Sequence, residues 1–123
     1  MKQADGFYKY WSFLIIYTLF IFFISTFPGN YFQKAPRFIF LDKIAHIFIY
    51  SVLGLISLRA FRGEKGITGR NLLFCLIYCM LVGVFDEAYQ SLVPERTVDF
   101  FDLLSDFSGA LIGSLIYYKS VTF

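Results

Sequence analysis

Four long apolar stretches, separated by short polar segments, dominate the chain. They cover residues 10–27, 38–58, 71–93 and 100–118. A helix needs about 20 mostly apolar residues to cross the hydrocarbon core of a membrane, so each stretch has the length of a spanning helix. No small-x-small cleavage pattern follows the first stretch, and we therefore expect it to be retained as a span. The pattern predicts an all-α polytopic membrane protein, a four-transmembrane-helix bundle that forms a single domain over residues 1–123.

The composition supports a membrane protein. Only 16% of the residues are charged and 58% are hydrophobic, with a mean hydropathy of +0.63. A soluble domain has about 25% charged residues, so this chain has too little charge to cover a surface that faces water. We expect membrane lipids to surround the protein. The net charge of +2 is too small to indicate a nucleic-acid partner.

The basic residues indicate how the spans are oriented, because cytoplasmic loops of membrane proteins carry an excess of Lys and Arg. Four spans place both termini and the middle loop, "RAFRGEKGITGR" at residues 59–70, on the same side. That side has seven of the eleven basic residues, and the other side has Lys34, Arg37, Lys43 and Arg96. We therefore predict a multi-pass protein of the cell membrane with both termini in the cytoplasm.

The acidic residues are distributed in the opposite way. The side away from the termini has the only histidine, His46, and seven of the nine acids: Asp42, Asp86, Glu87, Glu95, Asp99, Asp102 and Asp106. Three separate apolar stretches each carry charged residues near this end. This convergence predicts a polar cluster on the outward-facing side of the bundle.

The spacing in the last stretch predicts which way its acids point. Asp102, Asp106, Gly109 and Gly113 follow at intervals of four, three and four residues, and Asp99 precedes them by three, so they share one helix face. Glycines at such intervals let two membrane helices approach closely, and the acids should therefore point into a helix contact. This face fits packing inside one bundle and packing between the protomers of a homo-oligomer equally well.

The second and third stretches suggest local partners. Asp42 and His46 are four residues apart, a spacing at which two helical side chains can form a hydrogen bond. Asp42 also precedes the apolar part of its stretch and is predicted to cap the helix. Glu87 lies roughly 10 Å below the end of the third stretch, at about 1.5 Å per residue. At that depth it needs a partner, for which Lys43, His46 and Arg96 are candidates.

Two segments resemble the VanZ-like family of small bacterial membrane proteins. They are "DKIAHIFIYSVLG", which begins at residue 42, and "DEAYQSLVPERTVDFFDLLSDFSGALIG", residues 86–113. The family elements fall, in order, on Asp42, Lys43 and His46; on Asp86, Glu87 and Gln90; on Pro94 and Arg96; on Asp102 and Asp106; and on Gly109 and Gly113. The family commonly has Asn where this chain has Asp106, a departure that adds a charge.

The resemblance implies a role in the bacterial cell envelope, with the protein in the inner membrane. The family takes its name from a member associated with low-level resistance to the glycopeptide teicoplanin. Resistance to such an antibiotic is therefore part of what the resemblance implies, whereas a biochemical mechanism is not.

A binding site is the first function that fits the predicted cluster. Its acids would attract a cationic group or a divalent metal, and Arg96 and Lys43 would hold a phosphate. The ligand would be a lipid-linked envelope precursor or the glycopeptide itself. The residues assigned to ligand binding are Lys43, Asp86, Gln90, Arg96, Asp99, Asp102 and Asp106.

An enzyme acting on a lipid phosphate is the second function. His46 would be the general acid or base, oriented by Asp42. Either Glu87 or Asp102 would hold a metal or a second proton, and Arg96 would hold the phosphoryl group. Carboxylates with one histidine favour Mg²⁺ or Mn²⁺ over Zn²⁺, although the sequence specifies no cofactor. Proton-coupled carriers also use such acids, but four short spans are few for alternating access.

A cluster that only locks the helix ends together is the remaining alternative. It should contain similar numbers of acidic and basic residues. Seven acids against four basic residues on this side argue for an additional positive partner, because mutual pairing cannot cancel the difference.

Overall fold

The computed structural model describes residues 2–26, 36–62, 66–93 and 100–122. These residues form the helices α1 (Lys2–Ile24), α2 (Pro36–Phe61), α3 (Gly69–Gln90) and α4 (Phe100–Thr122). Each helix is long and apolar enough to cross a membrane. The prediction of an all-α, four-helix, multi-pass membrane protein is therefore confirmed.

The helix bounds differ from the predicted stretches by several residues. α1 begins at Lys2, well before the predicted span, because the polar residues near the N-terminus continue the helix. α2 begins at Pro36, a residue type favoured in the first helical turn, where its missing N–H is not needed. Asp42 consequently lies inside α2, and its predicted role as a helix cap is wrong. Both Asp42 and His46 therefore lie within α2, one turn apart.

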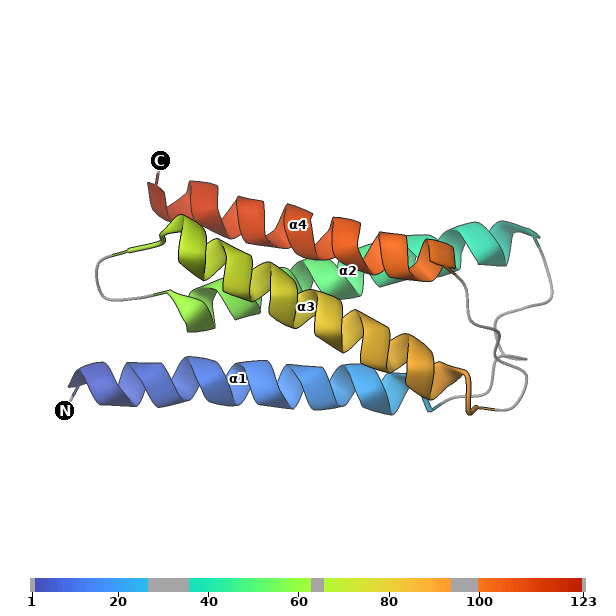
Figure 1. Ribbon diagram of the computed structural model, residues 1–123, viewed down its shortest axis with the longest axis horizontal. Helices are drawn as coiled ribbons and strands as arrows, with labels where there is room; N and C mark the ends of the chain where they lie inside the picture. The colour runs from blue at the N-terminus through green and yellow to red at the C-terminus, as the bar shows by residue number, and fades with distance from the viewer. Residues whose placement is uncertain (1, 27–35, 63–65, 94–99, 123) are drawn as a thin grey trace.

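The four helices alternate in direction along the chain, so that both termini lie at the same end of the bundle (Figure 1). α2 and α4 run in the same direction and make the most extensive contact, whereas α1 lies at the edge and packs mainly on α2. α3 crosses the bundle obliquely toward the C-terminal end of α1 (Figure 1). We call the end where α2 and α4 begin the acidic end, and the opposite end, with both termini, the basic end.

Glycines let α2 and α4 approach until their backbones touch. A Cβ atom placed on Gly109 would collide with the backbone carbonyl of Ile47, and one placed on Gly113 would collide with that of Ser51. Such close approach of small residues is a common way for membrane helices to associate, because lipid provides no hydrophobic force that drives helices together. The glycine face predicted from the sequence therefore packs inside the bundle, against α2.

The outward surfaces of the helices are apolar. Large hydrophobic side chains are exposed on every helix, among them Ile16, Phe48, Phe85 and Phe101. Soluble monomers rarely expose continuous apolar surface on this scale, and lipid is the environment that suits it.

Arginines and tyrosines join three helices at the basic end. Arg59 of α2 donates hydrogen bonds to the hydroxyl of Tyr10 on α1 and, over 3.1 Å, to that of Tyr117 on α4. Arg62 donates to the same Tyr117 hydroxyl over 3.3 Å. The two ends of the bundle thus differ in the charge they carry, as the distribution of basic and acidic residues predicts.

Replacing Gly113 with alanine should destabilise the bundle, because the added methyl group would overlap the backbone of Ser51. We expect the free energy of unfolding to fall by about 1–3 kcal/mol, the usual cost of overpacking. Titration with SDS, followed by circular dichroism, measures this change. Gly6→Ala is the matched control, since it is also helical and a Cβ there meets nothing within 4 Å. Equal stability of the two variants would contradict the close α2–α4 contact.

Candidate functional site

The acidic end contains a polar cluster formed by side chains of α2, α3 and α4 and by Ser25, the residue that follows α1. The acids of α3 and α4 in the cluster point inward as predicted, and the acidic and amide residues of these two helices in the cluster are at most 6% exposed. The cluster consists of Asp42, Lys43, His46 and Tyr50 on α2; Asp86, Glu87 and Gln90 on α3; Asp102 and Asp106 on α4; and Ser25.

His46 is surrounded by carboxylates on both sides of its ring. Its Nδ1 forms a hydrogen bond of 2.6 Å with Oδ1 of Asp106. Its Nε2 lies 3.7 Å from Oδ1 of Asp42 and 4.0 Å from Oδ1 of Asp102, distances of an ion pair rather than a hydrogen bond. Asp42 therefore faces His46 as the spacing predicts, but at a distance too long for the predicted hydrogen bond.

Lys43 forms an ion pair with Asp102, again between α2 and α4. This pair lies about one helical turn before the pair of His46 and Asp106 on both helices. The sequence suggested Lys43 as a phosphate ligand or a partner of Glu87, and both roles stay predictions; the structure pairs Lys43 with Asp102.

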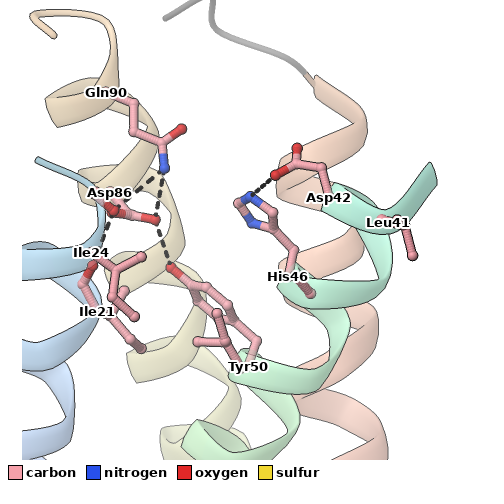
Figure 2. Close-up of a pocket in the computed structure, with 11 residues that line it drawn as sticks. Ile21, Ile24, Leu41, Asp42, His46, Tyr50, Asp86 and Gln90 are labelled. Atoms are coloured by element: carbon pink, nitrogen blue, oxygen red, sulfur yellow. Dashed lines mark hydrogen bonds and ion pairs between the residues drawn. The ribbon is translucent and has the colours of Figure 1, made fainter. Parts of the chain in front are cut away.

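Asp86 accepts hydrogen bonds from three parts of the chain (Figure 2). The hydroxyl of Ser25 donates to Oδ1, that of Tyr50 donates to Oδ2 over 3.3 Å, and the amide of Gln90 donates to Oδ2 over 3.4 Å. The amide of Gln90 also lies 3.4 Å from the hydroxyl of Ser25. Asp86 thus attaches the end of α1 to α2 and α3.

Two of these residues are absent from the set predicted from the sequence. Tyr50 follows His46 by four residues, so the face on which it lies was visible, but its partner on another helix was not. Ser25 lies near the end of the first apolar stretch, beside Thr26, and nothing in the local sequence distinguishes the two.

Among the residues that the structure describes, two sets of three side chains are close enough together to hold one cation. His46, Glu87 and Asp106 each offer a ligand atom within 4.8 Å of the others, and Asp42, His46 and Asp102 do the same. His46 was a predicted partner of Glu87, and the structure brings the two together. The predicted ligands Arg96 and Asp99 lie outside the described residues, so their roles stay predictions.

A cavity of about 350 Å³ lies between α1, α2 and α3 beside the cluster. Figure 2 shows Asp42 and His46 on one side of it and Asp86 and Gln90 on the other. Some of its lining side chains, such as Leu41, are exposed, so the cavity reaches the lipid-facing surface. The polar residues that line it are Ser25, Asp42, His46, Tyr50, Asp86 and Gln90, and the apolar ones are Ile21, Ile24, Leu41, Ala45 and Ile49.

Comparison with known proteins gives a match over nearly the whole chain. A family model described as VanZ/LLP1 matches residues 7–122. No curated protein and no solved structure matches the chain. The matched region includes every residue of the cluster.

Ser25 and Asp86 should be energetically coupled, because the serine hydroxyl donates to a buried carboxylate. In a double-mutant cycle, Ser25→Ala and Asp86→Ala together should cost less unfolding free energy than the sum of the single changes. We expect a difference of about 1.5–3 kcal/mol, typical of a hydrogen bond to a charged group. SDS titration measures each variant. The pair Ser25→Ala with Asp5→Ala is the control and should be additive, and additivity in both pairs would contradict the hydrogen bond.

Proposed function

Because this chain belongs to the VanZ/LLP1 family of membrane proteins, we propose that it binds an amphiphilic ligand of the bacterial cell envelope, either lipid-linked or phosphate-bearing. The observation that carries the proposal is the cavity beside the cluster, which is lined by both polar and apolar side chains. Binding pockets for small molecules are typically apolar clefts with a few polar groups that fix the orientation of the ligand.

The polar and apolar lining residues suggest how such a ligand would lie. Its hydrocarbon part would contact the isoleucines of α1 and α2, Ile21, Ile24 and Ile49. Its polar part would face His46 and Asp86, which lie on opposite sides of the cavity (Figure 2). A lipid would enter sideways from the membrane, because apolar lining residues such as Leu41 lie at the lipid-facing surface.

The charge of the cluster restricts the ligand. Among the described side chains at the acidic end, five carboxylates face Lys43 and His46 as the only basic groups. A phosphate would be repelled unless further positive charge accompanied it. Arg96, a cationic group on the ligand or a bound cation would each provide that charge.

Glycopeptide resistance fits this proposal. A site that binds a lipid-linked envelope precursor, or the glycopeptide itself, would reduce the contact between the precursor and the glycopeptide. The family name supports a contribution of this kind to teicoplanin resistance.

A membrane-embedded enzyme acting on a lipid phosphate headgroup is the second candidate function. The observation that favours it is the position of His46 between Asp42, Asp102 and Asp106. His46 would act as general acid or base, Asp42 would orient its ring, and Glu87 would hold a metal or a second proton. A cluster with only a structural role would explain the hydrogen bonds of Asp86 but not the cavity beside them.

The ligand proposal is tested with a polyprenyl phosphate and the polyprenol of the same chain length, bound to the purified full chain and measured by native mass spectrometry. The phosphate should bind more tightly, and Arg96→Ala should weaken its binding about tenfold, the effect of losing one charge-assisted contact. Arg70→Ala is the matched control, because Arg70 is exposed at the basic end.

Equal binding of the phosphate and the alcohol would contradict the ligand proposal, whereas no effect of Arg96→Ala would exclude Arg96 as the source of the positive charge. The same samples decide between binding and catalysis. Release of inorganic phosphate that disappears in His46→Ala would establish the enzyme, whereas recovery of intact ligand supports a binding protein.

We further propose that the acidic end faces the outside of the cell and that both termini lie in the cytoplasm. The arginines at the basic end support this orientation. In a Cys75→Ser and Cys79→Ser background, a membrane-impermeant maleimide should label Glu95→Cys on intact cells but label Glu64→Cys only after lysis. The reverse pattern would show that the acidic end faces the cytoplasm.

A further inference from the structure

We propose that His46, Glu87 and Asp106 form a binding site for a divalent cation between α2, α3 and α4. This site goes beyond the proposed ligand binding and does not depend on it. The three side chains come from three different helices, and each offers a ligand atom within 4.8 Å of the others. Ligand atoms that share a cation at about 2.1 Å are at most about 4.2 Å apart. Small side-chain adjustments are therefore enough to close the site.

Asp106 provides independent evidence for a ligand at this position. Its side chain is only 2% exposed, and its Oδ2 has no hydrogen-bond partner among the residues that the structure describes. A buried carboxylate oxygen without a partner is costly and calls for an explanation such as an ion. Oδ2 lies 3.5 Å from where a Cβ on Gly83 would stand, so it lies against α3. Glu87 lies one turn beyond Gly83 on that helix.

The environment of His46 leaves its Nδ1 suited to a cation. A neutral imidazole carries a hydrogen on only one of its two nitrogens. Nε2 faces Asp42 and Asp102, so a hydrogen there is stabilised by carboxylates. In the structure Nδ1 and Oδ1 of Asp106 share a hydrogen. A cation that binds here would displace this hydrogen, and Nδ1 would then direct its lone pair toward the cation beside Asp106 and Glu87. Metal-ligating histidines typically donate their other ring nitrogen to a carboxylate, and Asp42, with Oδ1 3.7 Å from Nε2, needs only a small shift to take this role.

The other set of three side chains is less suited to a cation. Asp102 already forms an ion pair with the ammonium group of Lys43, with which a metal would compete. The side chain of Asp42 is 33% exposed, whereas Glu87 and Asp106 are both buried. Asp42 and Asp102 therefore fit the role of orienting His46 rather than that of metal ligands.

The ligand set favours a first-row divalent metal. Two carboxylates and one imidazole combine ligands that suit Mn²⁺ with one that also suits iron and zinc. A cation at this position would also add positive charge beside the cavity, where a phosphate needs it.

The test is titration of the EDTA-treated full chain in detergent with MnCl₂, with free Mn²⁺ measured from its six-line EPR signal. We expect one Mn²⁺ to bind per chain. Asp106→Asn and Glu87→Gln should each weaken binding by more than about tenfold, as loss of a metal ligand does. Asp5→Asn, at the basic end, is the control and should leave binding unchanged. Pulsed EPR of the wild-type complex should show coupling of Mn²⁺ to a ¹⁴N nucleus, from His46.

Three results would overturn this site. The first is no uptake of Mn²⁺ by the wild-type protein. The second is uptake of Mn²⁺ without coupling to nitrogen. This measurement uses the wild-type protein, so it does not depend on the folding of any variant. The third is a loss of affinity in Asp86→Asn as large as that in Asp106→Asn, which would indicate diffuse attraction by the acidic end. Binding of polyprenyl phosphate in the absence of metal is measured separately, so failure of the cation site leaves the ligand proposal open to its own test.

Discussion

The direct backbone contact between α2 and α4 is the constraint on which the rest of the structure depends. Glycines on these helices remove the side chains that would hold the two backbones apart. Because the helices run parallel and touch, their polar residues meet in matched pairs: Lys43 with Asp102, and His46 with Asp106. A wider separation would leave these carboxylates without partners inside an apolar bundle, which is costly in a membrane.

The polar cluster has two parts that are attached to different helices. One part, around His46, belongs to the α2–α4 contact. The other, around Asp86, holds the end of α1 against α2 and α3 by hydrogen bonds from Ser25, Tyr50 and Gln90. The cavity lies between these two parts and is completed by apolar residues of α1 and α2. Its mixed character therefore follows from the way α1 is attached to the edge of the bundle.

Membership of the VanZ/LLP1 family identifies the class of protein but not a reaction. The chemistry of the cluster links the two proposals made for it. Carboxylates dominate the described side chains, so a phosphate-bearing ligand and a divalent cation would support each other's binding through opposite charge. His46 is central to both, because its ring separates the carboxylates that would orient it from those that would share a metal with it.

The sequence by itself determined the four spans, the gathering of acids at one end and the helix faces on which they lie. These features follow from local hydropathy and from the helical repeat, which need no knowledge of neighbours. Only the tertiary structure decided that the glycine face meets α2, that His46 bonds to Asp106 rather than Asp42, and that Ser25 and Tyr50 join the site. Those contacts depend on which helices touch and in what register, and residues about 36 to 61 positions apart in the chain leave no local pattern that specifies them.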